Sequence, residues 1–528
     1  MAKSFSLIAL ILFSLFSFSQ SLPLCTRGRW IIDAQTGKRV KLNCVNLVSH
    51  AQTMVAQGLD KRPLKELAAE ISSRQFNCVR LTWSVHMFTR YAYETIGDVL
   101  DGLDIGDVKN GVEKHNPEIL KMSVAKAFQT VINCLGSEGI MVILDNHISQ
   151  PRWCCSLDDG NGFFGDRNFN PNEWFQGLSF VATQFTCNPH VIGMSLRNEL
   201  RGPFTNNDAW CYYMRQGSQL IHRINPNILI IISGLNYDND LSYLKKRPLG
   251  YTLHNKVVLE AHLYSFSGDN ESKFVKKPLN IICNEIMEKF EREAGFVVDM
   301  ENPYPLFLSE FGYDQSGGNE AENRFMSCFL ARIAEKDIDW ALWAFQGSYM
   351  YRQGHTDPDE SFGVMDHSWT KDRNPKLAQL LQLVKRINQD PNSKAPMSYI
   401  MLHSVSGQCV RSDNKGGIEL GDCTSPTQWN HTGDASPMML LSNGQCLKSA
   451  GDGKSPMVSA ECSGDGSNWT VSSKAKLQLA TKIGEDNFCL EKESNASIVL
   501  KKCICLDEES CMDDPQTQWF KLVPTNVS

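Results

Sequence analysis

The chain has 528 residues, enough for two or three domains, because domains usually contain about 100 to 200 residues and single enzyme barrels about 250. Its 52 Lys and Arg stand against 59 Asp and Glu, which gives a net charge of −7, and no dense run of Lys or Arg occurs. This pattern argues against a nucleic acid as partner and predicts a mildly acidic surface.

The first residues have the pattern of a secretory signal peptide. Lys3 precedes an apolar run over residues 7–18, and small polar residues follow it. The run is shorter than the roughly 20 residues that a membrane span requires. We therefore expect residues 1–21 to be a signal peptide, and the protein to be secreted, extracellular or in the cell wall, with no membrane partner.

Cysteine usage agrees with secretion. Ten of the 18 cysteines precede residue 390 and eight follow residue 400, so each part of the chain can close its own disulfides. For the adjacent Cys154 and Cys155 we expect two separate structural bridges rather than a redox pair. Other pairings in the first part stay open. Candidates for N-glycosylation are Asn270, Asn430, Asn468, Asn495 and Asn526.

Short aliphatic segments alternate with amphipathic ones over most of the chain. Amphipathic stretches at 63–76 and 123–139 are typical of helices, and they separate predicted strands. The eight predicted strands are residues 42–48, 78–83, 140–147, 191–199, 227–234, 256–266, 305–310 and 338–345. Eight strands with helices between them predict an α/β fold, a (β/α)₈ TIM barrel.

A composition change marks the end of this barrel. Residues 386–398, RINQDPNSKAPMS, collect turn-forming residues between a helical segment and an aliphatic strand. We therefore predict a barrel domain over 22–388, a linker over 389–397 and a second domain over 398–524.

The second domain repeats itself three times. Each unit has a Cys in a first strand, a turn, a second strand ending in Cys, and a closing Trp, and the Trps are Trp429, Trp469 and Trp519. Such units bury one shared core. The repeat predicts four disulfides, the last within an insertion in the third unit: Cys409–Cys423, Cys446–Cys462, Cys489–Cys503 and Cys505–Cys511.

This pattern resembles the ricin B-type lectin family, and the resemblance implies an all-β β-trefoil. The family closes each repeat with Gln-x-Trp, but the Gln is replaced here in Thr427-Gln428-Trp429, Ser467-Asn468-Trp469 and Thr517-Gln518-Trp519. The family's galactose-holding Asp falls at Arg411, Lys448 and Glu491, of which only Glu491 is a carboxylate. These replacements argue against a galactose site. A glycan is a candidate ligand that the resemblance implies, and the fold alone does not establish it.

Polar and aromatic residues stand at the ends of predicted strands two, three, four, six, seven and eight. Barrel enzymes carry their chemistry at these carboxyl ends. Each residue alone has a structural explanation, such as a core histidine or a helix cap. Their joint presence on one rim favours a catalytic site. The residues are Arg80, Trp83, Asp145, Asn146, His147, Asn198, Glu199, His262, Tyr264, Glu310 and Trp343.

The order of these residues resembles glycoside hydrolase family 5, the cellulase-like family of retaining barrel glycosidases, over about residues 25–385. Leu200 replaces the Pro that follows the acid in many members. The family's functional positions are all filled, by Arg80, His147, Asn198, Glu199, His262, Tyr264, Glu310 and Trp343.

The resemblance implies a retaining glycosidase that cleaves β-linked polysaccharides by double displacement. Glu199 would be the general acid and base, and Glu310 the nucleophile. We expect burial and repulsion to raise the pKa of Glu199, while Arg80 and Tyr264 keep Glu310 charged.

The other residues would bind the substrate, a β-linked poly- or oligosaccharide. Asn198 would hold the sugar 2-hydroxyl, His147 and His262 would line the cleft, and Trp343 would stack on a pyranose ring. The loop at 153–174 would form one wall of the cleft. Its Trp153 and Trp174, with Trp369, either extend the aromatic platform or pack in the core.

Several alternatives stay open. The same residues suit a transglycosylase, and a carbohydrate-binding or lectin protein with an inactive barrel is a further reading. Cellulose, mixed-linkage glucan, mannan, xylan-type polymers and smaller β-glucosides all suit the site. No cofactor and no metal site is predicted, because no Gly-rich phosphate loop follows a strand and His50, His147 and His262 lack the tight spacing of metal ligands.

Overall fold

The computed structural model describes residues 23–267, 271–413, 416–493, 496–506 and 510–527. The predicted signal peptide and the sequons at Asn270 and Asn495 lie outside these ranges. Within them, no helix has both the length and the apolar composition needed to cross a membrane.

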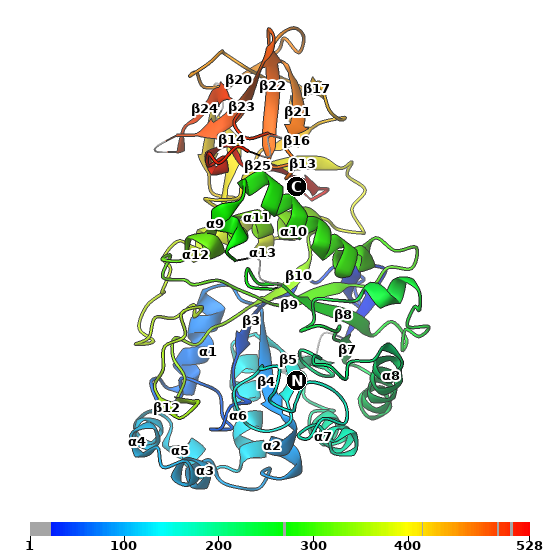
Figure 1. Cartoon of the computed structure of the whole chain (residues 1–528), viewed down its shortest axis with the longest axis vertical. Coiled ribbons are helices and arrows are strands. Elements are labelled where there is room, and N and C mark those ends of the chain that lie inside the picture. Colours follow the sequence, from blue (N-terminus) through cyan, green and yellow to red (C-terminus); the bar gives the residue numbers. More distant parts are fainter. Residues whose placement is uncertain (1–22, 268–270, 414–415, 494–495, 507–509, 528) are drawn as a thin grey trace, which may run out of the picture.

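Eight parallel strands form a closed barrel in the order β10-β3-β4-β5-β6-β7-β8-β9 (Figure 1). The residue range of each strand overlaps that of one predicted strand, so the predicted eight-stranded parallel barrel is confirmed. The strands are β3 (Asn43–Leu47), β4 (Cys78–Ser84), β5 (Met141–Ile148), β6 (Val191–Ser195), β7 (Leu229–Ile232), β8 (Val257–His262), β9 (Leu306–Phe311) and β10 (Asp339–Leu342).

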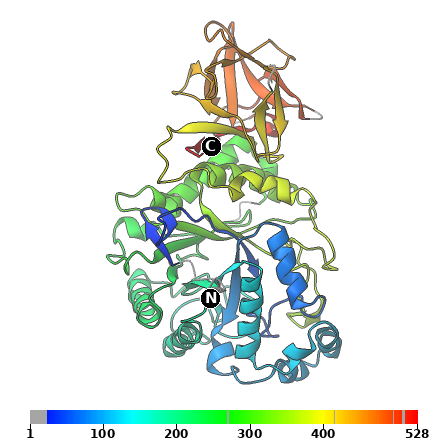
Figure 2. The ribbon, with the colours of Figure 1, turned by 180° about the vertical axis from the view of Figure 1, so that it is seen from behind.

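Helices surround the barrel in both views (Figures 1 and 2). Four long ones begin at polar N-caps, because Ser123, Asn170, Asn206 and Asn319 each accept a backbone N–H of the first turn. The helices are α1 (Leu64–Ser73), α2 (Val85–Thr89), α3 (Ile96–Gly102), α4 (Gly106–His115), α5 (Pro117–Leu120), α6 (Val124–Ser137), α7 (Pro171–Gln184), α8 (Asn207–Ile224), α9 (Lys273–Lys276), α10 (Leu279–Glu293), α11 (Glu320–Lys336), α12 (Leu377–Leu380) and α13 (Gln382–Lys385).

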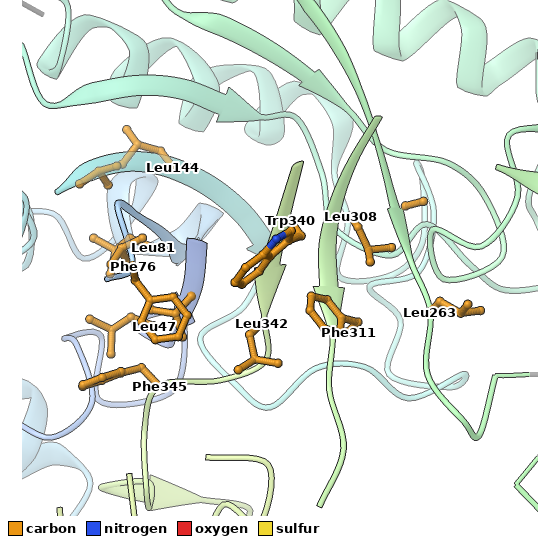
Figure 3. Close-up of a cluster of buried hydrophobic side chains, with 14 of the residues drawn as sticks. Leu47, Phe76, Leu81, Leu144, Leu263, Leu308, Phe311, Trp340, Leu342 and Phe345 are labelled. Carbon is orange, nitrogen blue, oxygen red and sulfur yellow. The ribbon is translucent and has the colours of Figure 1, made fainter. Parts of the chain in front are cut away.

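The barrel strands have an apolar outer face and a mixed inner face. Leu81 and Trp340 belong to the large cluster between strands and helices (Figure 3). Ile143 and Phe307 belong to a second cluster, together with Leu24 from the antiparallel pair β1 (Leu24–Arg27) and β2 (Trp30–Asp33). Since side chains alternate along a strand, the outward Leu81 turns its neighbour Arg80 into the barrel.

A separate β-rich region follows the barrel. It forms one sheet in the order β15-β14-β13-β16-β18-β19-β20, with β25 paired to β13, and a second in the order β17-β21-β22-β23-β24. Its strands are β13 (Ser398–His403), β14 (Gln408–Ser412), β15 (Ile418–Gly421), β16 (Gln428–Asn430), β17 (Ser436–Pro437), β18 (Met439–Leu440), β19 (Cys446–Lys448), β20 (Met457–Ser459), β21 (Asn468–Ser472), β22 (Gln478–Ile483), β23 (Asp486–Lys492), β24 (Ile498–Lys502) and β25 (Phe520–Thr525).

The three repeats are three antiparallel pairs, β14–β15, β19–β20 and β23–β24. The four disulfides predicted here are present: Cys409–Cys423, Cys446–Cys462, Cys489–Cys503 and Cys505–Cys511. Trp429 and Trp469 lie in one core, but Trp519 instead donates from Nε1 to Oδ1 of Asn280, at 3.0 Å. Val410, Leu447 and Leu490, one from each unit, lie in the core that holds Trp429 and Trp469, so the expectation that the three units share one core is confirmed, while the third Trp faces helix α10 of the barrel.

The disulfides of the barrel differ from expectation. Three are present, Cys44–Cys78, Cys154–Cys155 and Cys283–Cys328, while Cys25, Cys134, Cys187 and Cys211 are unpaired. The prediction of two separate bridges at Cys154 and Cys155 is therefore wrong. Cys44 and Cys78 face each other in adjacent parallel strands, whereas the loop after β5 brings two neighbouring side chains together, which only the folded backbone reveals.

The β-rich region is seated on α10 and α11 (Figures 1 and 2). Asn280 donates from Nδ2 to Oε1 of Gln478 at 2.8 Å, and Nζ of Lys521 lies 2.7 Å from Oε1 of Glu335. Residues 389–397 contain no helix or strand, and Asp390 there exchanges hydrogen bonds with Asn526. The two parts of the chain are therefore joined by buried polar contacts as well as by the connecting segment.

Candidate active site

The inner face of β4 and the end of β9 bring an arginine and a carboxylate together. Arg80 is fully buried and donates from Nη1 to Oε1 of Glu310 at 2.7 Å. The hydroxyl of Tyr264, two residues beyond β8, donates to Oε2 of Glu310 at 3.1 Å. Each oxygen of Glu310 therefore has its own donor.

Glu199 reaches the same space from the loop after β6. Its φ is 47°, a left-handed conformation that is uncommon for a residue with a side chain. Neighbouring groups hold this conformation: Asp238 accepts from the Glu199 backbone N–H at 2.9 Å, and Arg201 donates to its carbonyl at 2.9 Å. Backbone strain maintained in this way is concentrated at functional sites in proteins.

The two carboxyl groups meet beside His262. Oε1 of Glu199 is 3.0 Å from Nδ1 of His262, and a carboxylate oxygen of each acid and a nitrogen of this ring all lie within 4.8 Å of one another. His262 makes its second contact, from Nε2, with Oγ of Ser309 at 3.0 Å. The two acids are thus close neighbours, and the imidazole of His262 lies beside both of them.

Burial raises the pKa values of both acids. The pKa of Glu199 rises to about 7, mainly through loss of hydration, while Arg201 and Arg80 oppose this. The pKa of Glu310 rises to about 6, because burial outweighs the opposing charges of His262 and Arg80. The predicted order of the two pKa values holds, but the pKa of Glu310 is raised as well, since its donors only partly replace water.

His147 stands between two aromatic rings. Its Nδ1 lies 2.6 Å from Oδ2 of Asp145, and its ring stacks on His50 at 4.0 Å and on Trp343 at 5.6 Å between centroids. Burial and the charge of Arg80 hold the pKa of His147 well below its usual value. The imidazole is therefore neutral at physiological pH.

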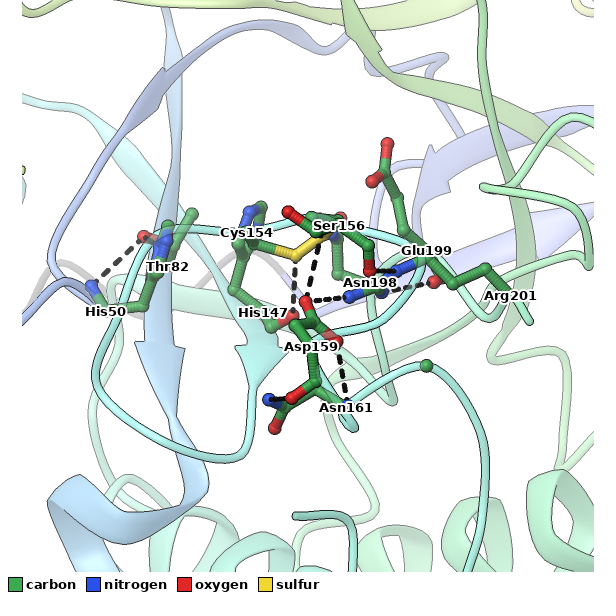
Figure 4. The surroundings of a disulfide bond; sticks show 12 residues. His50, Thr82, His147, Cys154, Ser156, Asp159, Asn161, Asn198, Glu199 and Arg201 are labelled. Atoms are coloured by element: carbon green, nitrogen blue, oxygen red, sulfur yellow. Dashed lines mark hydrogen bonds and ion pairs between the residues drawn. A yellow bond between two sulfur atoms is a disulfide. The ribbon is translucent and has the colours of Figure 1, made fainter. Parts of the chain in front are cut away.

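Asn198 links the arginine to the loop wall. Its Oδ1 accepts from Nη2 of Arg80 at 2.8 Å, and its Nδ2 points toward the Cys154–Cys155 disulfide (Figure 4). The structure thus brings together the eight residues of the predicted constellation, drawn from β4, β5, β8, β9 and the segments after β6, β8 and β10.

The other aromatic candidates divide. Trp174 and Trp369 are buried and donate from Nε1 to Leu196 and Ser348, so they are core residues. Trp153 is partly exposed and lies edge-on to Trp343, with 6.5 Å between centroids. Of these three, only Trp153 extends the aromatic surface beside Trp343.

Sequence reasoning named Asp145 but missed Glu260 and Asn46, which form a buried polar layer with it around Arg80. Arg80 lies 3.0 Å from Asp145 and 3.8 Å from Glu260, and it donates to Oδ1 of Asn46 at 2.9 Å. Burial raises the pKa of Glu260. Its signal was available, because Glu260 stands two residues before His262 and so on the same face of β8, whereas Asp238 lies in a loop and had no such signal.

Two groups of potential metal ligands lie at the site, but the cysteines of His147, Cys154 and Cys155 are joined in a disulfide, which leaves Glu199, His262 and Glu310. The guanidinium of Arg80 contacts Glu310 directly, so a cation there would meet a fixed positive charge at close range. The donor set therefore suits acid–base chemistry better than it suits metal binding.

A family model described as cellulase, glycosyl hydrolase family 5, matches residues 34–348. The chain belongs to this family. A protein of Chamaecyparis obtusa described as a glycosyl hydrolase 5 family protein is 41% identical over 540 residues, covering 98% of this chain and 96% of that protein. The similarity to that relative thus continues through the β-rich region.

Solved structures resemble the family 5 barrel. A hyperthermophilic endocellulase of Pyrococcus horikoshii matches with a TM-score of 0.57 and 19% identity, over 69% of this chain and 99% of that one. The catalytic domain of the major endoglucanase of Xanthomonas campestris matches with a TM-score of 0.56 and 21% identity, over 69% and 99%. These likenesses show the fold. With the family membership, the protein is a glycosidase.

Proposed function

We propose that this family 5 enzyme hydrolyses β-glucans by double displacement, with Glu199 as general acid and base and Glu310 as nucleophile. The observation that carries the proposal is the close approach of the two carboxyl groups, with one oxygen of Glu199 within 4.8 Å of one oxygen of Glu310. Retaining glycosidases hold their carboxyls about 5 to 5.5 Å apart, whereas inverting enzymes leave about 6.5 to 9.5 Å for a water molecule. The close approach of the two oxygens favours the retaining arrangement.

The two steps follow from the protonation states. Glu199, whose pKa is raised to about 7, still carries a proton at mildly acidic pH and gives it to the leaving oxygen. Glu310 is ionised above its pKa of about 6 and attacks the anomeric carbon. Glu199, now a carboxylate, then takes a proton from water, which breaks the glycosyl-enzyme bond and restores both acids.

Neighbouring residues would bind and orient the sugar. Arg80 and Tyr264 hold the carboxylate of Glu310 in position for attack, and Asn198 offers its amide to the 2-hydroxyl, a contact that strengthens in the transition state. The neutral His147 can donate or accept a hydrogen bond with a hydroxyl. Trp343, beside Trp153, offers an aromatic face to a pyranose ring.

The substrate class comes from the relatives. A Paenibacillus polymyxa protein described as an endoglucanase is 20% identical over 384 residues, and the Pyrococcus horikoshii endocellulase has been solved in complex with cellotetraose. A β-linked glucan is therefore the substrate that we propose first for this chain.

We further propose that the protein is secreted, with a signal peptide over 1–21, a (β/α)₈ barrel over 22–388, a linker over 389–397 and a ricin B-type β-trefoil over 398–524. The 18 cysteines and the seven disulfides of the described chain favour an oxidising compartment. The three antiparallel strand pairs, each closed by a disulfide, favour the trefoil.

Galactose is not the ligand that we propose for this trefoil. Arg411 lies 3.2 Å from Asp422, and Lys448 pairs with Glu461, so the positions of the family's Asp carry paired cations in two repeats. In the third, Oε2 of Glu491 already accepts from Nε2 of Gln518 at 2.9 Å.

Release of reducing sugar tests the main proposal. The purified protein is assayed on β-glucans, mannans and xylans beside a Glu310→Gln variant, which keeps the size of the side chain and removes the nucleophile. We expect release from β-glucans and a loss of at least about 10⁴-fold in the variant. An unchanged rate in the variant, or release from mannan or xylan alone, would contradict the proposal. Activity seen only with added acceptor sugars would indicate a transglycosylase.

A further inference from the structure

The disulfide between Cys154 and Cys155 lies directly against the site (Figure 4). Nδ2 of Asn198 is 3.7 Å from Sγ of Cys155 and 4.0 Å from Sγ of Cys154. Sγ of Cys154 is also 4.0 Å from the carbonyl oxygen of His147. A disulfide stabilises a fold mainly by closing a loop and so lowering the entropy of the unfolded chain. A cross-link between two adjacent residues closes almost no loop, so stability is a weak reason for this one.

The carboxamide of Asn198 is held at both ends. Arg80 donates to its oxygen at 2.8 Å, which assigns the other end as the amide nitrogen. Among the residues that the structure describes, this nitrogen faces the two sulfurs and donates to no oxygen. Sulfur is a weak acceptor, so the nitrogen keeps donor capacity for a sugar hydroxyl, while the sulfurs limit how the carboxamide can rotate.

The loop that carries the disulfide is anchored to the segment that carries Glu199. Arg201, which is buried, donates from Nε to the carbonyl of Ser156 at 3.0 Å and from Nη1 to the carbonyl of Glu199 at 2.9 Å. Its Nη2 also bonds to Oδ2 of Asp159. Because charge-assisted bonds of this kind are strong when buried, the loop that carries the two cysteines stays fixed to the segment that carries Glu199.

The covalent bond adds what the anchoring cannot. Two separate thiols would rotate independently about their own side-chain torsions. Joined to each other, the sulfurs of Cys154 and Cys155 form one surface facing the same amide nitrogen.

We propose that the Cys154–Cys155 disulfide positions Asn198 for the 2-hydroxyl of the sugar whose bond is cleaved. The inference rests on the proposed function of Asn198 as the 2-hydroxyl ligand. The disulfide acts through Asn198 and is a positioning element. Since that contact strengthens in the transition state, losing the disulfide lowers kcat more than it raises KM.

A pair of substrates tests the role. One is an aryl β-cellobioside, and the other is the same glycoside without the 2-hydroxyl on the ring that carries the aryl group. In a Cys154→Ala/Cys155→Ala variant we expect kcat/KM to fall about tenfold on the first and less than about twofold on the second, as for the loss of one oriented hydrogen bond. For each substrate, kcat/KM of the variant is divided by kcat/KM of the wild type, so the different intrinsic reactivities of the two substrates cancel.

Two controls isolate the disulfide. A Cys283→Ala/Cys328→Ala variant, which removes the bond between α10 and α11, should lower thermal stability and leave the ratio between substrates unchanged. In an Asn198→Ala background, replacing Cys154 and Cys155 should lower kcat/KM little further, because the side chain that the disulfide positions is gone.

The outcomes are distinguishable. An equal loss on both substrates, or no loss on either, would overturn the positioning role. No turnover by the wild type would instead overturn the proposed function, and this inference with it. Should the double variant fail to fold, dithiothreitol can reduce the wild-type bond to two thiols, supplying the electrons and protons. The loss of kcat/KM should then appear only on the substrate that has the 2-hydroxyl, and it should reverse on reoxidation. The same result is expected for the Cys283→Ala/Cys328→Ala protein. A loss on both substrates would again contradict the role.

Discussion

Arg80 and Glu310 form a buried ion pair across the barrel, with Nη1 of the arginine 2.7 Å from Oε1 of the glutamate. They come from β4 and β9, which are not neighbours in the barrel. Burial raises the pKa of Glu310 to about 6 and that of Glu199 to about 7, and His262 and then Arg80 oppose the rise for Glu310. One acid is therefore ionised in a pH range where the other is still protonated.

This difference predicts a bell-shaped pH dependence of kcat/KM. Activity should fall as the pH drops below about 6, because Glu310 takes up a proton, and fall again above about 7, because Glu199 loses its proton. Initial rates on a soluble β-glucan between pH 4 and pH 9 would measure both limbs. The values belong to the coupled pair. A rate that is flat from pH 6 to pH 9 would contradict the assignment of Glu199 as the acid.

The raised pKa of Glu199 also predicts a stability effect. In the unfolded chain this group ionises near its ordinary pKa of 4.5, but in the folded chain only near 7, so its ionisation opposes folding increasingly between these values and fully above 7. Replacing Glu199 with Gln should therefore raise the free energy of unfolding at pH 8 by about 3 kcal/mol and change it little at pH 4. Urea denaturation of both proteins at the two pH values measures this difference. A stabilisation of equal size at both would show that charge is not its source.

Tyr264→Phe should impair the nucleophile without unfolding the site. The hydroxyl donates to Oε2 of Glu310, which favours the charged carboxylate, so its loss should raise the pKa of Glu310 and move the acidic limb to higher pH. We expect kcat/KM at the optimum to fall by about tenfold. Tyr313→Phe is the matched control, because its hydroxyl accepts from Asn374 outside the acid pair. Equal effects of the two substitutions would count against a direct role of Tyr264.

Asn280→Ala should weaken the seat of the β-rich region. The Asn280 side chain bonds to Gln478, to the carbonyl of Cys505 and to Nε1 of Trp519, and all of these contacts are buried. Leaving such groups unpaired costs about 1 to 3 kcal/mol each at most, so we expect a loss of about 2 to 4 kcal/mol in thermal or chemical denaturation.

The control for this change is Asn133→Ala, at an exposed position of α6, which should change stability by less than about 0.5 kcal/mol. Catalysis on soluble substrate should be the same in both variants, because neither residue touches the acids. A stability loss no larger than that of the control would show that the barrel and the β-rich region contribute independently.

Much of the architecture was readable in local patterns. Aliphatic strands alternating with amphipathic helices predicted the eight barrel strands, and the spacing of cysteines predicted the four disulfides of the β-rich region, because each of these features repeats within a short stretch of chain. The strand-end positions of Glu310 and His262 were readable for the same reason, since a polar residue in an aliphatic strand stands out.

The environment of those residues was decided only by the tertiary structure. Arg80 meets Glu310, Asn198 and Asp145 through contacts that span the barrel, and the raised pKa of Glu310 comes from the water that this packing excludes. The Cys154–Cys155 bond and the contact of Trp519 with Asn280 likewise depend on backbone paths that no periodicity records. The sequence by itself determined which elements form and which chemical groups they carry, because propensity and alternation act over a few residues. Distances, burial and charge balance are set by groups far apart in the chain, and they exist only once the barrel closes.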